Sequence, residues 1–260
     1  MRSNPLQLRA LALGLTVAAT FCAASLEHAI AQGRPNGAAA SEATGRLGVP
    51  VSQDPSGYWV AVVTEQWHLR MSMPPPGDFD MLPLNAAARE RAAAWDPAAD
   101  AANGLECASY GAPVIMRVPS RLRFRWVDDD TLELDIDSGT QTRLLHFGAA
   151  AGNQNPTASW QGHSVASWEG TGAERYLTVR TTHLRPGYLR KNGAPYSADT
   201  RLEEHFYAFT EPNGDRWLVV TSIVTDPQNL TRPYTTTNHF KQQRNNAGWD
   251  PTPCRVDRPR

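Results

Sequence analysis

The chain has few cysteines, no excess of either charge and no second long apolar run. Each of these shortages excludes a class of structure or of binding partner. Among its 260 residues are only three Cys, and 25 basic residues nearly balance 26 acidic ones. The formal net charge of −1 provides no basic footprint for a nucleic acid. Beyond the N-terminal segment no stretch is apolar enough to cross a bilayer, so we expect no membrane span. Nothing in the sequence decides the oligomeric state.

The N-terminal segment has the features of an export signal. Arg2 and Arg9 supply positive charge, and the apolar run from Leu11 to Ala24 is too short to span a bilayer as a helix. Ala29-Ile30-Ala31 fits the small-x-small pattern of a cleavage site. We therefore predict a signal peptide over residues 1–31 and a periplasmic or secreted mature chain.

Cleavage at that site removes Cys22 and leaves Cys107 and Cys254. An even pair of cysteines in an oxidising compartment predicts a disulfide between them, with two buried free thiols as the alternative. A lipid anchor on Cys22 is disfavoured, because the preceding Phe21 is bulkier than the small residue expected there.

The mature chain divides into a short leader and one domain. Residues 32–50 are rich in Ala, Gly and Ser without apolar periodicity, which predicts a flexible N-terminus. Residues 51–260 have a length that suits a single all-β domain. The 20 Pro and 19 Gly predict many turns, and the eight Trp predict large aromatic surfaces in a core or around a ligand.

Period-two alternation dominates that domain, and it predicts a first strand over residues 58–71. Residues 121–126 alternate Arg with apolar side chains, and residues 131–136 alternate acidic with apolar ones, which predicts a hairpin fixed by opposed charges. Asn85 is expected to cap a helix from Ala86 to Trp95. Further strands are predicted near residues 140–147, 159–168, 176–184, 201–210, 216–225 and 234–241.

About eight to nine sequential strands with one short helical segment predict an all-β fold. A closed antiparallel β-barrel is the favoured architecture, because closure removes the exposed sheet edges. A two-sheet β-sandwich is the alternative. Gly57-Tyr58-Trp59, at the start of the first strand, resembles the G-x-W opening of lipocalin-type barrels.

Longer segments resemble a group of exported bacterial proteins of unassigned function. Residues 160–170 match its W-x-G-H-S-x-x-x-W-E-G segment, residues 226–235 its D-P-x-x-x-T-R-P-[WY]-T segment, and residues 83–116 its early P-L-N to I-M stretch. The chain departs from the group where residues 171–174 replace a D-T-L-V-V continuation. The resemblance implies export and a barrel-like fold, and it brings no activity with it.

Glu65 is the first candidate for chemistry, because the alternation places it on the same strand face as Trp59 and Trp67. An ionised carboxylate on an apolar face is costly unless it is paired or its pKa rises. Glu65 is therefore expected to act as a general acid or base, or else to pair with an Arg from a neighbouring strand. The Arg candidates are Arg117, Arg143 and Arg180.

Two further residues complete the candidate catalytic set of Glu65, His183 and Glu204. His183 shares a strand face with Leu177 and Val179, and an imidazole exchanges protons near neutral pH. Glu204 shares a face with Leu202 and Phe206, and two carboxylates in one cavity can divide acid and base roles. The alternatives are a hydrogen-bonded wall position for His183 and a rim salt bridge for Glu204.

The candidate ligand-binding residues come from the tryptophans and from the loop over residues 182–196, which mixes Arg and Tyr with turn residues. They are Trp59, Trp67, Trp160, Trp168, Arg185, Tyr188 and Tyr196. The histidines lack the paired spacing of a metal motif, and Gly162-His163-Ser164 is not completed as a nucleophile elbow because Ala166 replaces the second Gly. We expect neither a metal nor another cofactor.

Three functions remain open. The first is an exported barrel protein that binds a small apolar or aromatic molecule in an interior cavity. The second is an enzyme of the lyase, hydratase or isomerase type that uses Glu65 and His183 as acid and base. The third is a structural envelope protein without a ligand. Barrels of this size either hold one small ligand or are filled by side chains.

Overall fold

The computed structural model describes residues 44–152 and 155–256, which belong to one compact unit. The predicted signal peptide over residues 1–31 and the leader as far as residue 43 lie outside the described residues. At the start of the described part, a 3-10 turn spans Arg46–Gly48, and Arg46 donates a hydrogen bond to Asp129.

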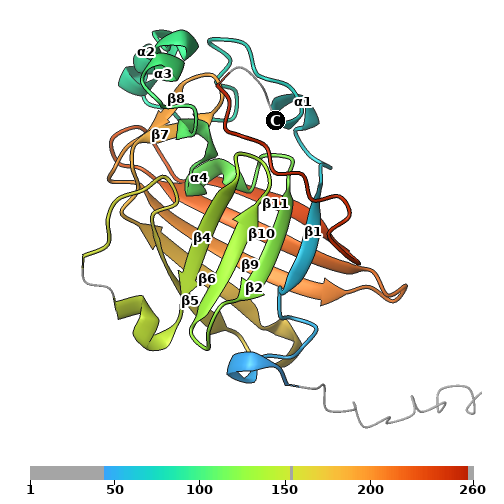
Figure 1. The fold of residues 1–260 in the computed structure, drawn as a ribbon. Helices are drawn as coiled ribbons and strands as arrows, with labels where there is room; N and C mark the ends of the chain where they lie inside the picture. Colours follow the sequence, from blue (N-terminus) through green and yellow to red (C-terminus); the bar gives the residue numbers. More distant parts are fainter. Residues whose placement is uncertain (1–43, 153–154, 257–260) are drawn as a thin grey trace, which may run out of the picture. The chain divides into compact units, whose positions relative to one another are not determined.

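Nine of the described strands close into a barrel in the order β1-β11-β10-β9-β6-β5-β4-β3-β2 (Figure 1). Closure occurs where β1 pairs with both β11 and β2. The predicted all-β fold is therefore confirmed, as a barrel and not as a sandwich. The strands are β1 Gly57–Val62, β2 Arg121–Trp126, β3 Thr131–Ile136, β4 Gln141–His146, β5 His163–Glu169, β6 Tyr176–Thr182, β9 Arg201–Thr210, β10 Arg216–Thr225 and β11 Tyr234–Gln243.

One pairing in the barrel wall differs from the antiparallel pattern. β4 and β5 run parallel, with Leu145 opposite Ser164. The chain between them, which includes a 3-10 turn at Gly148–Gly152, is long enough to return along the barrel before β5 begins. Parallel neighbours need such a crossover, whereas antiparallel neighbours such as β2 and β3 can be joined by a short turn. The barrel is therefore mixed, although mostly antiparallel.

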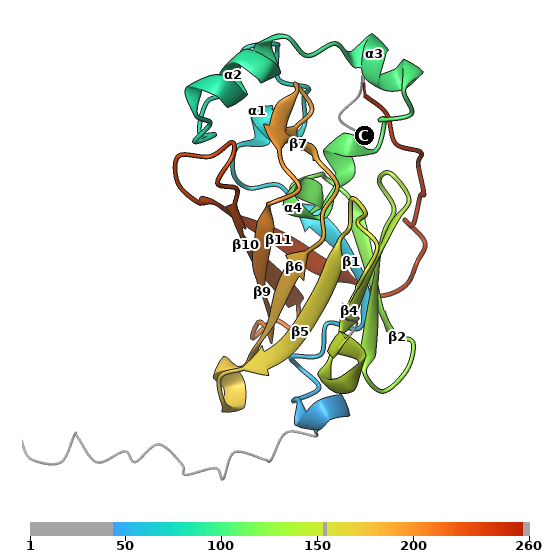
Figure 2. The same cartoon turned by 90° about the vertical axis from the view of Figure 1, so that its left-hand side faces the viewer.

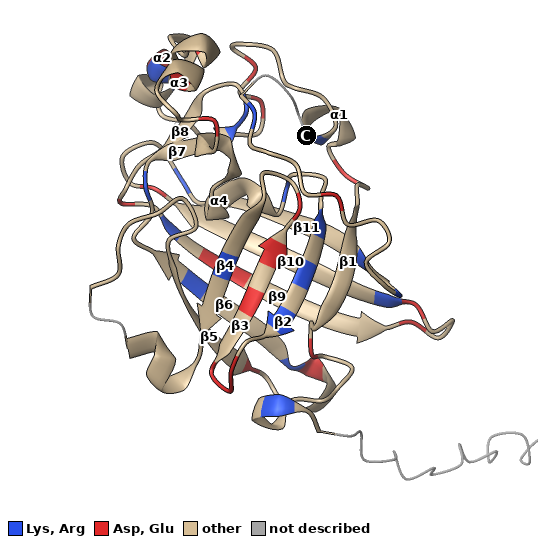
Figure 3. Cartoon of the chain, in the orientation of Figure 1, with Lys and Arg blue, Asp and Glu red and all other residues tan. Residues whose placement is uncertain are grey.

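The charged hairpin forms as the sequence predicts. β2 pairs with β3, so that Arg123 lies opposite Asp135 and Arg125 lies opposite Glu133. Both pairs form ion pairs, and Figure 3 shows the basic residues of β2 beside the acidic residues of β3. The alternate residues, such as Phe124, are buried in the barrel. The alternation therefore separates a charged outer face from an apolar inner one.

Apolar side chains fill the centre of the barrel. Trp59 is fully buried there, and its Nε1 donates a hydrogen bond to the Pro55 carbonyl at 2.7 Å. The same buried cluster includes Leu122, Phe124, Leu132, Leu134, Phe206, Leu218, Val220 and Phe240. These side chains come from β1, β2, β3, β9, β10 and β11, so the inner faces of opposite walls meet.

Short helices and a hairpin cover one end of the barrel (Figures 1 and 2). We call residues 67–119 and 185–197 the cap. Many of its buried side chains pack in a second cluster with Leu202, Val224 and Tyr234, which lie at the ends of barrel strands. Others, such as Tyr110 and Val118, belong to the barrel cluster. Its elements are α1 Trp67–Arg70, α2 Ala86–Ala93, α3 Pro97–Ala102, η2 Ala108–Tyr110, α4 Ala112–Ile115, β7 Gly187–Arg190 and β8 Ala194–Tyr196. A further 3-10 turn, at Gly172–Glu174, lies outside the cap.

The predicted first strand is wrong beyond Val62. β1 ends there, because Val62 opposite His239 is the last pair that β1 makes with β11. Gln66 then adopts a left-handed conformation with φ 47°, and α1 begins at Trp67. Without a neighbouring strand, the alternating residues that follow do not continue the barrel wall.

The early helix and the disulfide are both confirmed. The Asn85 side chain accepts a hydrogen bond from the Ala88 amide at 2.9 Å and so caps α2, which ends at Ala93. Cys107 and Cys254 form a disulfide with 5.0 Å between their Cα atoms. This bond ties the cap to the C-terminal segment across 147 residues of sequence.

Candidate functional site

Glu65 lies at the edge of the cap, not on the buried face of a strand. About 33% of its side chain is exposed, and its carboxylate forms an ion pair with Arg70. Thr64 Oγ1 donates a hydrogen bond to Glu65 Oε2 at 2.7 Å, and His239 Nδ1 lies 3.5 Å from the same oxygen. Partial burial alone would raise the pKa of Glu65, but the Thr64 hydrogen bond and the charges of Arg70 and His239 hold that pKa below its usual value.

His183 does not point into the barrel. β6 ends at Thr182, and His183 follows in a left-handed conformation with φ 55°. This turn reverses the alternation, so His183 is exposed whereas Leu184 is buried. The His183 Nδ1 lies 2.9 Å from Thr182 Oγ1. Glu65 and His183 therefore do not form the predicted pair, and the imidazole beside Glu65 is that of His239.

Glu204 is inside the barrel and forms an ion pair with Arg143. Both side chains are 0% exposed, and Arg143 Nη2 lies 2.6 Å from Glu204 Oε2. The predicted inward direction of Glu204 is correct, but the rim salt bridge is wrong because the pair is fully enclosed. Arg143 is also excluded as the partner of Glu65. Arg180 lies outside the barrel with Glu203 and Glu169.

Further polar side chains surround this buried ion pair. Arg143 Nη2 lies within hydrogen-bond distance of the Ser164 and Thr181 hydroxyls, and Ser222 donates to Glu204 at 3.5 Å. Asn238 is fully buried on the inner face of the next strand. The bonded group thus spans five neighbouring strands from β4 to β10, and its two charges neutralise each other.

The four candidate tryptophans lie in different surroundings. Trp59 fills the barrel core, and Trp168 is partly buried against the same cluster. Trp67 is on the surface with 65% of its area exposed. Trp160 is half-buried, and the Arg185 guanidinium lies 4.3 Å from its ring centroid. The four rings therefore do not gather around one space, and a role for them in ligand binding stays a prediction.

The other three candidate ligand-binding residues do come together. Arg185, Tyr188 and Tyr196 line one open groove on the cap, which Arg91 also lines. Tyr188 donates a hydrogen bond to Asp100 at 3.1 Å. The Tyr196 side chain is almost fully buried, and this burial raises its pKa.

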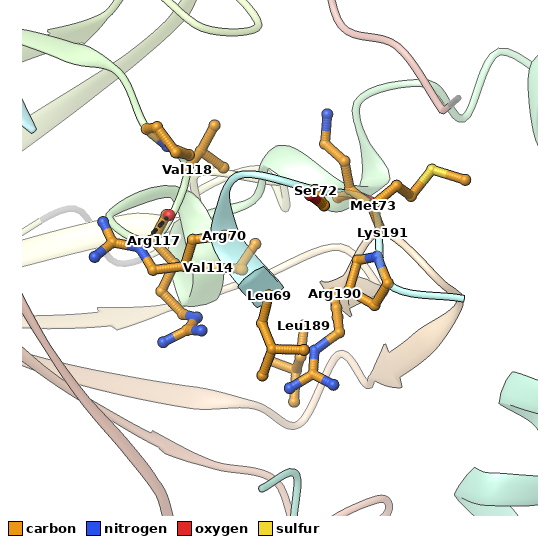
Figure 4. Close-up of a pocket in the computed structure, with 13 residues that line it drawn as sticks. Leu69, Arg70, Ser72, Met73, Val114, Arg117, Val118, Leu189, Arg190 and Lys191 are labelled. Atoms are coloured by element: carbon orange, nitrogen blue, oxygen red, sulfur yellow. Dashed lines mark hydrogen bonds between the residues drawn. The ribbon is translucent and has the colours of Figure 1, made fainter. Parts of the chain in front are cut away.

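A second pocket lies within the cap, and four basic side chains line it together with apolar ones (Figure 4). Its volume is about 50 Å³. α1, the segment after α4 and the end of β7 each contribute a cationic side chain. We call this the basic pocket. Its lining residues are Leu69, Arg70, Ser72, Met73, Pro74, Ser109, Val114, Arg117, Val118, Pro119, Leu189, Arg190 and Lys191.

Hydrogen bonds hold the Arg side chains of the pocket in place. Arg70 Nε donates to the Arg117 carbonyl at 2.9 Å, and Arg117 Nη2 donates to Gln66 Oε1 at 2.9 Å. Arg190 donates to the carbonyls of Asp78 and Asp80 at 3.0 and 2.8 Å. Burial lowers the pKa values of Arg70 and Arg190, and the nearby charge of Arg117 lowers both further.

The remaining cation of the pocket contacts neutral groups. Lys191 Nζ lies 4.0 Å from the centroid of the Tyr110 ring, donates to the Tyr110 hydroxyl, and lies 3.4 Å from the Arg255 carbonyl. The Arg117 guanidinium lies 6.0 Å from the ring centroid of Tyr234, at the start of β11. The pocket thus adjoins both the barrel end and the C-terminal segment.

Sequence reasoning missed most of this site. Arg117 was a candidate only as a partner for Glu65. Arg190 and Lys191 belong to the candidate loop over residues 182–196 but were not chosen from it, and Arg70 was not a candidate. The alternation predicted over residues 58–71 places Arg70 on the strand face opposite that of Glu65, and Arg190-Lys191 precede the turn signal Asn192-Gly193, where exposed charges are common. Their burial depends on the packing of the cap, for which no local pattern exists.

No family model, no curated protein and no solved structure matches this chain. The resemblance to the exported bacterial group therefore stays a prediction. Within the part of the chain that the structure describes, no helix is long and apolar enough to span a bilayer. The same residues contain no cluster of three or more His, Cys, Asp or Glu side chains placed to hold a metal ion.

Proposed function

We propose that this chain is an exported barrel protein that binds a small molecule, and that its ligand site is the basic pocket of the cap. The observation that carries the proposal is the space of about 50 Å³ between apolar and cationic side chains of three separate cap segments. Binding sites for small molecules combine apolar walls with a few fixed polar groups. The apolar wall here consists of Leu69, Val114, Val118 and Leu189.

The predicted ligand was a small apolar or aromatic molecule in an interior cavity. Trp59, Phe124, Phe206 and Phe240 occupy the barrel centre, which favours the cap over the interior as the site. An apolar part of the ligand would contact the leucine and valine wall of the basic pocket. The Cys107–Cys254 disulfide supports export, because such bonds persist in oxidising compartments.

A blocking variant tests the location of the site. Ser72 is exposed and lines the pocket, so Ser72→Trp would fill the space without removing a core side chain. Ser167 is exposed on β5, away from the cap, so Ser167→Trp is the matched control. We expect the wild type and Ser167→Trp to retain a small molecule during purification from the periplasm, and Ser72→Trp to lose it. Equal retention by all three proteins, or no retained molecule in any of them, would contradict the proposal.

Enzymatic activity is the second candidate, and the contact between Glu65 and His239 favours it. The carboxylate and the imidazole lie 3.5 Å apart, beside Arg70, which also lines the basic pocket. A lowered pKa keeps Glu65 ionised near neutral pH, so its carboxylate is in the form that accepts a proton, although it is a weak base. Incubation of the extracted molecule with wild type and with Glu65→Gln tests this candidate. If the protein is an enzyme, Glu65→Gln loses turnover and retains binding. The structural envelope alternative predicts no ligand for any variant.

A further inference from the structure

We propose that the ligand of the basic pocket is an anion whose carboxylate or phosphate group binds between Arg70, Arg117 and Arg190. The inference rests on the proposed binding function and names the chemical class of the ligand. The two groups share the oxyanion chemistry that guanidinium groups recognise through paired N–H donors.

The lining of the basic pocket carries an excess of positive charge. Arg70, Arg117, Arg190 and Lys191 all line the pocket, and each is only 4–8% exposed (Figure 4). None of the described lining residues is an Asp or Glu. Lys, Arg, Asp and Glu are almost never fully buried without a partner. The buried positive charge of the three arginines, Arg70, Arg117 and Arg190, therefore needs a source of negative charge.

Two neighbouring carboxylates supply only part of that charge. Glu65 pairs with Arg70, and an Asp78 carboxylate oxygen lies 3.8 Å from Arg190. Arg117 has no carboxylate within 4.0 Å among the described residues, and its side chain donates only to the neutral Gln66. Two acids thus face three arginines, and Arg117 is the one without a counter-charge.

The guanidinium of Arg70 also has a hydrogen-bond donor without an acceptor in the described part of the chain. Arg70 Nη2 is buried and has no hydrogen-bond partner among the described residues, although the other two nitrogens of the same guanidinium are bonded. A buried donor without a partner is costly, and the cost is greater on a charged group. An oxyanion in the pocket would accept from this nitrogen and would neutralise the charge of Arg117.

The size of the pocket agrees with this assignment. A space of about 50 Å³ suits a carboxylate or phosphate group with a short chain, whereas drug-sized ligands occupy pockets of roughly 300–1,000 Å³. The side chains of Leu69 and Leu189 lie beside the cationic groups and would contact that chain (Figure 4). The site therefore favours small organic acids or small phosphate esters.

Calorimetric titration of the full mature protein at low ionic strength tests the inference. The probes are propionate, its neutral isostere propionamide, and inorganic phosphate. We expect at least one anion to bind and propionamide not to bind. Saturation by propionate alone identifies a carboxylate site, and saturation by phosphate alone identifies a phosphate site.

Variants locate the bound anion. Arg117→Met removes the cation that lacks a counter-charge, and it should weaken anion binding by about tenfold or more. Arg180→Met, on the outer face of β6, should leave binding unchanged. Arg117→Gln replaces Arg117→Met if the latter does not fold, with the same expected loss.

Three results would overturn the inference. Equal binding of propionate and propionamide would show a binding pocket without preference for charge, so the proposed function would stand and the anion would be wrong. Anion binding that is unchanged in both Arg117 variants would place the anion elsewhere. Failure of every probe to bind would also reject the inference that the ligand is an anion. The proposed binding function would still be supported in that case if the purified protein retained a molecule that only Ser72→Trp loses.

Discussion

The ion pair between Arg143 and Glu204 gives the sharpest prediction about the barrel. Its two side chains are fully enclosed, with 2.6 Å between Arg143 Nη2 and Glu204 Oε2. We consider Arg143→Met, Glu204→Leu and the double variant, which replaces both charges with apolar groups. The comparison separates the cost of an unpaired charge from the net contribution of the pair.

Each single variant leaves one charge without its partner inside the barrel. Removal of one member of a buried pair costs about 3–5 kcal/mol, because the remaining ion stays desolvated. Ser164 and Thr181 can still bond Arg143 in Glu204→Leu, so the cost for that variant should be near the lower value. The double variant removes both charges, and its stability should lie within about 2 kcal/mol of the wild type or above it.

Urea unfolding followed by tryptophan fluorescence measures these free energies. The exposed pair Arg180–Glu203 serves as the control cycle, with an expected coupling of about 0–1 kcal/mol. Single variants that each cost less than about 1 kcal/mol, or a double variant that costs the sum of the two, would refute the reasoning.

Three further predictions concern the cap and its connections. Cys107→Ser with Cys254→Ser should lower the free energy of unfolding by up to about 5 kcal/mol, the chain-entropy value for a loop of 147 residues, as measured by urea unfolding. Asp226 is buried, which alone would raise its pKa, but hydrogen bonds from Asn229 and Ser197 hold the pKa below its usual value. The ionised Asp226 therefore stabilises the fold fully above about pH 4, and this contribution disappears as the pH falls through the lowered pKa. Acidification should consequently lower the urea midpoint of Asp226→Asn less than it lowers the urea midpoint of the wild type. Asn85→Ala should cost about 1 kcal/mol through loss of the α2 cap, and thermal unfolding would detect it.

The sequence predicts the barrel wall well where alternation and pairing act together. β9 and β10 have the predicted bounds, and the hairpin of β2 and β3 has the predicted charge pairs. Each of these strands has a neighbour on both sides, so the local pattern and the tertiary structure agree. The Cys107–Cys254 bond follows from the even count of cysteines, which does not depend on the fold.

The sequence predicts the candidate site poorly. Glu65 and His183 both follow the last paired residue of a strand, where the chain turns. Beyond that point, alternation along the sequence no longer predicts which side chains point inward. The buried cations Arg70 and Arg190 come from cap segments far apart in sequence, and only tertiary packing brings them to one pocket. No periodicity in the sequence predicts that these two side chains line the same pocket.

The most direct test of the account is the response of individual arginine side chains to an anion. Nuclear magnetic resonance of the labelled mature protein resolves each Arg Nε–H group, and the assigned signals are followed during titration with propionate and with phosphate. We expect saturable shifts at Arg70, Arg117 and Arg190, which line the basic pocket, and constant signals at Arg143 in the barrel and Arg185 in the groove. Unchanged signals at the three pocket arginines, or shifts confined to Arg185, would contradict it.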